Sequence, residues 1–267
     1  MRSITFDTDY LTRTMLVVAF FCFALLIVTA PAAYVDDRTL YGINLWIKPL
    51  KFDLAIMVHA VTVAMIAQLL TREKRGAISL RVLAFLFVIA AAFENVYITI
   101  QAMRGRASHF NYETVPEQAL YAAMGVGAIL LILLPFVIGV HLAFQRGRAP
   151  SGLRLGAILG CVLGPPLTLA YAGYMSMSGG HFVGAPAGYS DAGGAFFFGW
   201  SRDVGDLRPS HFVALHMIQS VPIAGYIGDR LSHGAGRIAA IAAALIMAAL
   251  STFLFVQALG GAPFWPR

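Results

Sequence analysis

Residues 118–144 read QALYAAMGVGAILLILLPFVIGVHLAF and contain no Asp, Glu, Lys or Arg. A helix needs about 20 predominantly apolar residues to cross the hydrocarbon core of a bilayer. The run is continuous rather than alternating, so it predicts a membrane-spanning helix and not a strand of a β-barrel. Similar runs lie at 11–33, 46–70, 81–103, 154–177, 209–229 and 236–258. The sequence therefore predicts an all-α, polytopic membrane protein with seven transmembrane helices.

The composition agrees with this prediction and excludes a soluble globular protein. Of the 267 residues, 59% are hydrophobic and 12% are charged, whereas a soluble domain has about 45–50% apolar and about 25% charged residues. Seven crossings with short connections use the whole chain, so we expect one seven-helix domain over 1–267. The formal net charge of +6 fits basic cytoplasmic loops, and we expect no nucleic-acid partner.

The distribution of Lys and Arg predicts how the chain is oriented. With seven crossings, eleven of these residues fall on the N-terminal side and eight on the other: Arg2, Arg13, Arg72, Lys74, Arg75, Arg81, Arg146, Arg148, Arg154, Arg230 and Arg237 make up the eleven. Because short cytoplasmic loops are enriched in Lys and Arg, we expect a cytoplasmic N-terminus and a C-terminus outside.

The longest predicted connection, 178–207, is outward-facing and rich in glycine and aromatic residues. A run such as Phe196, Phe197 and Phe198 beside Trp200 is unusual in a solvated loop, so we expect this segment to lie on or dip into the outer membrane face. Connections of more than about 12–15 residues are often functional. The loop covers a site or serves as an interfacial aromatic anchor, and the sequence leaves both readings open.

Ionisable residues inside the predicted helices gather at a common depth. His59 lies eight residues below Lys51, and His216 eight residues below Arg208, about 12 Å along each helix. Glu94 lies ten residues inward of Arg104, about 15 Å deep. Because an ionisable side chain in hydrocarbon costs several kcal/mol, we expect these three residues to face one another in the outer half of the bilayer.

A second layer of polar residues is expected nearer the outer surface. Glu94, Tyr97 and Gln101 share one helix face by their i, i+3, i+7 spacing. His211 is three residues after Arg208 but five before His216, which separates the two imidazoles by about 140° on a regular helix. A helical two-His zinc motif is therefore absent, as is the H-E-x-x-H signature.

The predicted outer turn 104–111 adds donors, including His109. Its arginines fit an anionic headgroup or a quinone carbonyl, and they fit equally well a role in complementing the C-terminal dipole of the preceding helix.

Three segments carry a resemblance to known sequences. They are IKPLKF at 47–52, QAMRGRASHFN at 101–111, and GDLRPSHFVALHMIQ at 205–219. The chain resembles a family of bacterial multi-pass membrane proteins of unassigned function. The resemblance implies a bacterial inner-membrane location and implies that these three outer segments meet. It implies no activity.

The residues support three hypotheses about function. In the first, His59 and His216 bind haem b, or with Glu94 an iron or copper ion, in a membrane oxidoreductase acting on a quinol or another lipid-soluble substrate. In the second, Glu94 and the two histidines form the relay of a small-solute or proton-coupled transporter. In the third, a His-bound metal and Glu94 or Asp53 serve a lipid-modifying enzyme.

We favour the first hypothesis and assign roles accordingly. His59 and His216 are metal or haem ligands, and Glu94 is a ligand or the catalytic proton acceptor. The substrate or cofactor contacts are Lys51, Gln101, His109, Arg208 and His211. The expected partners are membrane lipids and a quinone or similar lipophilic molecule. The small-residue spacing of Gly156 and Gly160 fits close helix contacts within one chain or between two copies.

Overall fold

A computed structural model describes residues 8–145, 151–186, 188–189, 192–195 and 197–266 of the chain. Within these ranges, six helices are long and apolar enough to cross a membrane: α1 (Tyr10–Val35), α2 (Ile47–Ala67), α4 (Ile78–Met103), α5 (Val115–Ala143), α6 (Gly152–Met177) and α9 (His233–Leu259). The chain is therefore an all-α, multi-pass membrane protein. Each predicted run up to residue 177, and the last one, coincides with one of these helices.

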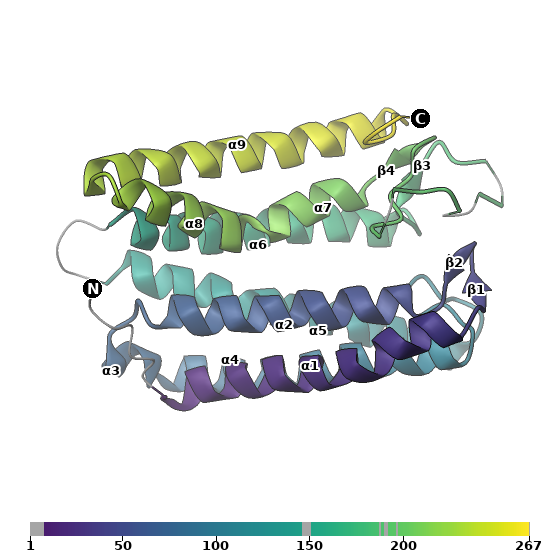
Figure 1. The fold of residues 1–267 in the computed structure, drawn as a ribbon, viewed down its shortest axis with the longest axis horizontal. Coiled ribbons are helices and arrows are strands. Elements are labelled where there is room, and N and C mark those ends of the chain that lie inside the picture. The colour runs from purple at the N-terminus through teal and green to yellow at the C-terminus, as the bar shows by residue number, and fades with distance from the viewer. Residues whose placement is uncertain (1–7, 146–150, 187, 190–191, 196, 267) are drawn as a thin grey trace.

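The long helices lie side by side along the longest axis of the molecule (Figure 1). The two ends differ. One carries the short strand pairs β1 (Thr39–Leu40) with β2 (Ile43–Asn44) and β3 (Phe182–Val183) with β4 (Gly205–Asp206). We call it the hairpin end. The opposite end carries the short helix α3 (Arg72–Arg75) and is called the α3 end.

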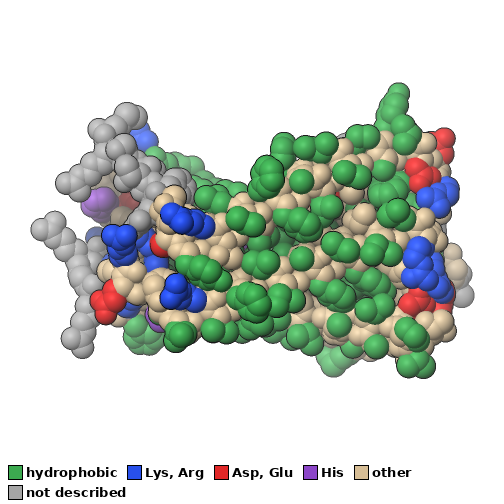
Figure 2. Space-filling model, turned by 90° about the horizontal axis from the view of Figure 1, so that it is seen from below, with side chains coloured by type: hydrophobic (Ala, Val, Ile, Leu, Met, Phe, Trp, Pro, Cys, Tyr) green, Lys and Arg blue, Asp and Glu red, His purple; other side chains and the backbone are tan. Residues whose placement is uncertain are grey.

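Hydrophobic side chains cover the middle of the molecule between the two ends. Figure 2 shows them as a broad band on one face, with acidic and basic side chains gathered at either end. Large apolar side chains in the spanning helices are well exposed, for example Phe20 at 72% and Ile246 at 64%. Apolar surface of this kind is stable against lipid, so the band marks the part of the protein that the bilayer surrounds.

Polar side chains fix where several helices begin. Asp9 accepts a hydrogen bond from the backbone N–H of Thr12 and caps α1. Thr114, Ser151 and Ser232 cap α5, α6 and α9 in the same way. Such caps satisfy backbone donors that have no partner inside the helix.

The run predicted over 209–229 folds as two helices in line. They are α7 (Arg208–Leu215) and α8 (Met217–Asp229), separated at His216, where ψ is 1°. Together they extend alongside α6 and α9 over most of the length of the bundle (Figure 1). The prediction of a helical segment here is correct, but the break at His216 was not predicted.

Glycines of α6 allow its backbone to lie in close contact with the backbone of α8. A Cβ atom at Gly160 would lie 2.4 Å from the carbonyl oxygen of Met217, and one at Gly156 would lie 2.5 Å from that of Val221. These contacts lie within the chain, so the small-residue spacing is used for packing of α6 against α8.

Substitution of Gly160 should therefore destabilise the bundle. We expect Gly160→Ala to lower the free energy of unfolding by about 1–3 kcal/mol, because the added methyl group must displace helix backbone. Thermal unfolding of the purified protein in detergent measures this effect. Gly173→Ala in the same helix is the matched control, since a Cβ there meets nothing within 4 Å. Equal unfolding temperatures for the two variants would contradict the close approach.

Candidate functional site

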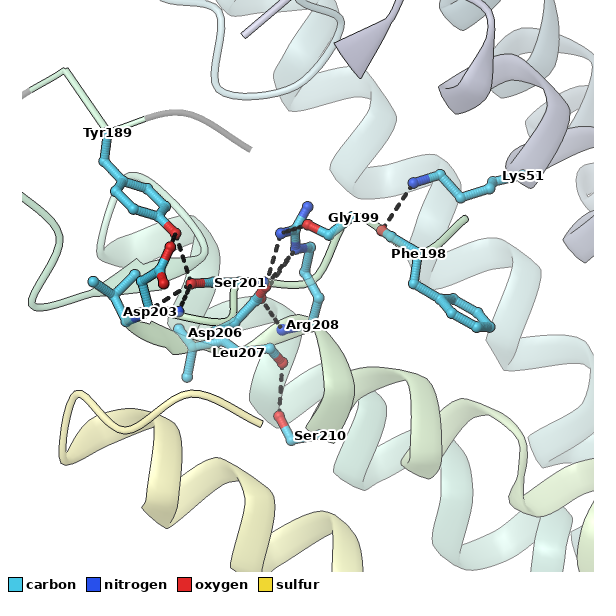
Figure 3. A network of polar contacts seen from close by, with 11 residues as sticks. Lys51, Tyr189, Phe198, Gly199, Ser201, Asp203, Asp206, Leu207, Arg208 and Ser210 are labelled. Atoms are coloured by element: carbon cyan, nitrogen blue, oxygen red, sulfur yellow. Dashed lines mark hydrogen bonds and ion pairs between the residues drawn. The ribbon is translucent and has the colours of Figure 1, made fainter. Parts of the chain in front are cut away.

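The segment 198–200 of the long connection is held by cations from two different helices. Lys51 of α2 donates to the carbonyl oxygen of Phe198 at 3.1 Å, and Arg208 of α7 donates to that of Gly199 at 2.7 Å. Figure 3 shows both side chains reaching the same stretch of chain. Lys51 and Arg208, which were predicted to contact a substrate, thus tie the connection to the hairpin end of α2 and α7.

Asp206 orients Arg208 for this contact. Its carboxylate accepts three charge-assisted hydrogen bonds from the guanidinium group, at 3.0 and 3.2 Å from Nε and 2.7 Å from Nη2 (Figure 3). It also accepts the backbone N–H of Ser201 at 2.8 Å. Asp206 is buried, and the paired donors compensate for the loss of water around its charge.

A stack of aromatic rings leads from this segment to His216. Phe198 and Trp200 are stacked at 4.5 Å between centroids, and both contact Phe212. Phe212 in turn stacks on the imidazole of His216 at 3.9 Å. The connection therefore covers the end of α7, although the alternative roles of lid and interfacial anchor stay predictions.

The turn between α4 and α5 meets α2 through His109. Nζ of Lys48 lies 3.1 Å from Nδ1 of His109, and because an ammonium group only donates, Nδ1 is the acceptor. The ring also packs near Phe52 of α2 and Tyr121 of α5. Burial and then the charges of Lys48 and His181 hold the pKa of His109 well below its ordinary value. His109 is therefore neutral at physiological pH.

Gln101 uses its side chain to close the same turn. Its amide nitrogen donates to the hydroxyl of Tyr97 at 3.1 Å and to the carbonyl of Ala107 at 3.0 Å. Its amide oxygen accepts from Arg104 at 2.9 Å. The predicted face shared by Tyr97 and Gln101 exists, and the amide of Gln101 is occupied by these protein contacts.

Glu94 lies deeper, between α4 and α5. It is 2% exposed, and neither carboxylate oxygen has a hydrogen-bond partner among the described residues. A Cβ atom at Gly127 of α5 would lie 3.0 Å from Oε1, so the glycine leaves the space that the carboxyl group fills. Lys48 interacts with Glu94 electrostatically. A carboxyl group in these surroundings requires a proton or a cation to compensate its charge.

His59 and His216 are each held by one ring nitrogen. Nε2 of His59 lies 3.1 Å from the carbonyl oxygen of Leu131, and Nδ1 of His216 lies 2.8 Å from that of Phe212. Because a carbonyl only accepts, these nitrogens carry the hydrogen. In each neutral ring the other nitrogen, Nδ1 of His59 and Nε2 of His216, then has a free lone pair.

The two histidines lie at the same level of the bundle. Gln219, three residues after His216, donates to the hydroxyl of Thr62, three residues after His59, at 3.3 Å. Towards the hairpin end, Lys51 and Arg208 meet neighbouring carbonyls of residues 198 and 199. The α2 segment and α7–α8 therefore run in parallel and in register, and His59 and His216 interact electrostatically.

Glu94 does not share this level. It lies against Gly127, whereas His59 bonds to Leu131, one turn further along α5 from the hairpin end. Four residues correspond to about 6 Å along the helix. The expectation of one plane for all three residues is therefore wrong in this respect, and in the described part of the chain no three His, Cys, Asp or Glu residues are grouped so that they could hold a metal ion.

His211 lies on α7 and takes no part in the contacts described above. Within the ranges that the structure describes, its side chain has no hydrogen bond or ring contact. It stays a predicted substrate contact.

Some polar contacts were missed by sequence reasoning. Lys48 received no role, although its spacing to Phe52 and His59 places the three on one helix face. Asp53, buried and bonded to Thr29 at 2.9 Å, faces α1 instead. No local sequence signal distinguishes that pairing.

The three segments that carry the sequence resemblance meet at the hairpin end. Lys48 of the first contacts His109 of the second, and Lys51 of the first shares the 198–199 segment with Arg208 of the third. Comparison of the chain with known protein families, curated proteins and solved structures finds no match. The proposed kinship with bacterial membrane proteins therefore stays a prediction.

The burial of His109 predicts how stability depends on pH. Its pKa is lower in the folded protein than the ordinary value of 6.5, so below about pH 6.5 the unfolded chain binds a proton that the folded protein resists. We expect the unfolding temperature to fall between pH 6.5 and 5, and less so in His109→Gln. Thermal unfolding in detergent at each pH measures this. His233→Gln, at an exposed position of the α3 end, should keep the wild-type decline, and an unchanged decline in His109→Gln would contradict the prediction.

Proposed function

We propose that the protein is a seven-span protein of the bacterial inner membrane with its hairpin end outside. In this proposal α7 and α8 together form the seventh crossing, the N-terminus is cytoplasmic and the C-terminus is outside. The excess of Lys and Arg on the N-terminal side supports this orientation. The site around His59, His216 and Glu94 then opens towards the outer face.

We further propose that this site binds a metal centre, haem b or a transition-metal ion, and serves a membrane oxidoreductase with a lipid-soluble substrate. One observation carries the proposal: His59 and His216 lie at one level, each is oriented by a backbone carbonyl, and the second ring nitrogen of each has no hydrogen-bond partner among the described residues. Metal-binding histidines are typically oriented by such a hydrogen bond on the other nitrogen. A bound metal centre would supply the electron transfer.

Glu94 fits the role of proton acceptor better than that of ligand. It is one turn nearer the hairpin end than His59, and its oxygens have no donor among the described side chains. Tyr121, Gly127 and Leu131 of α5 contact His109, Glu94 and His59 in turn. Titratable groups thus contact α5 at successive levels from the hairpin end inward, as a route for protons to the outer side requires.

A spectrum and an elemental analysis of the purified protein test the metal proposal. From haem- and metal-replete cells we expect a Soret band or about one transition-metal ion per chain. His59→Ala and His216→Ala should each abolish it, because each removes one of two ligands. His141→Ala and His233→Ala, at the α3 end, are the controls and should keep it. Colourless, metal-free wild-type protein would overturn the proposal.

A proton-coupled transporter is the second candidate, and the break at His216 favours it. Discontinuous helices and unpaired intramembrane carboxyl groups are common in transporters. In that case solute flux into proteoliposomes would respond to a pH gradient, and Glu94→Gln would lose this response. Glu113→Gln, an exposed position at the hairpin end, is the control. Flux that is unaffected by Glu94→Gln would exclude this candidate.

A further inference from the structure

A lateral groove between α1 and α2 opens on the lipid-facing surface of the bundle. Its volume is about 380 Å³, and it is lined by Ala19, Phe20, Phe23, Met57, Val58, Val61 and Thr62. Thr62 is the one polar side chain of this lining. The other residues provide an apolar surface that suits a hydrocarbon chain.

Thr62 links the lining of the groove to Gln219 of α8. The hydroxyl of Thr62 donates to the carbonyl of Val58 at 2.7 Å and accepts from Nε2 of Gln219 at 3.3 Å. The other amide atom, Oε1 of Gln219, is buried and has no donor among the residues described. A buried acceptor of this kind costs about 1–3 kcal/mol unless a donor reaches it.

The surroundings of Gln219 define what kind of donor fits. Gln219 lies one turn from His216, whose ring stacks on Phe212. No Lys or Arg lines the groove, so the anionic headgroup of a phospholipid would find no partner there. A neutral, hydroxyl-bearing aromatic ring satisfies the amide oxygen and suits the aromatic neighbours.

We infer that the groove and Gln219 form the binding site of a quinol, with the chain in the groove and a ring hydroxyl donating to Oε1 of Gln219. This inference rests on the proposed function and names its substrate class. The chain enters sideways from the membrane, and the ring comes to lie beside His216. Val58 and Val61 determine whether a chain fits, and Gln219 determines whether the hydroxyl is recognised.

Two probes and two substitutions separate these contributions. The probes are decylubiquinol and the same quinol ring without the decyl chain, added under reducing conditions to purified protein while the unfolding temperature is measured. Val58→Trp should weaken the binding of decylubiquinol at least about tenfold and leave the binding of the chainless quinol unchanged. Gln219→Leu should weaken the binding of both probes about tenfold, as expected for one lost hydrogen bond to a buried acceptor.

Controls keep this experiment decisive. Leu245→Trp places the same large side chain on a lipid-facing position of α9 and should bind like the wild type. If Val58→Trp does not fold, Val61→Phe narrows the same wall. Unchanged decylubiquinol binding in the groove variants, or an equal stabilisation by dodecanol, would overturn the inference.

The outcome is distinguishable from failure of the metal proposal. The absorption spectrum and metal content are recorded on the same preparations without quinol. Quinol binding by colourless, metal-free protein would keep the site and reject the metal centre. A bound metal centre together with quinol binding that does not depend on the groove would support the metal centre and reject the quinol site.

Discussion

A polar atom inside the hydrocarbon of a bilayer has no water to bind, so it must find its partner within the protein or bear the cost of having none. Most intramembrane polar groups here follow this requirement locally. Asp53 accepts a hydrogen bond from Thr29 of α1, and His59 and His216 donate to backbone carbonyls. Glu94 is the clear departure, since its carboxyl group is enclosed without a donor among the described residues. Asp53, Asn95, Thr99 and Gln219 each keep one side-chain oxygen without a partner, whereas both carboxylate oxygens of Glu94 lack one among the described residues.

The separation of Glu94 from the two histidines divides the chemistry into two levels. The imidazoles lie where α2 and α7–α8 run in register, and the carboxyl group lies a turn closer to the hairpin end. In the proposed function, a group that exchanges protons thus lies between a metal centre and the outer face. Such an order lets protons leave towards one side, which a purely symmetric cluster of three ligands would not provide.

The sequence predicted the long helices well because hydrophobic length is a local property. It also predicted the common depth of His59 and His216, since residue spacing along two parallel helices translates directly into distance. It could not predict the direction in which a side chain points around its helix, which depends on the neighbours. His59 therefore faces Leu131 and Asp53 faces Thr29, although both belong to α2. The break at His216 was also not predicted, because the apolar run over 209–229 continues across it.

The glycines of α6 have a mechanical consequence for the broken helix. Gly156 and Gly160 face backbone atoms of α8, and Gly164 faces the carbonyl of Ala214 in α7. Both α7 and α8 therefore pack against the same row of glycines on α6. Rotation of either helix about its own axis would bring its backbone into collision with α6. Packing against α6 consequently fixes the direction in which His216 points from its helix. In the proposed function, the imidazole is thus oriented before a ligand binds.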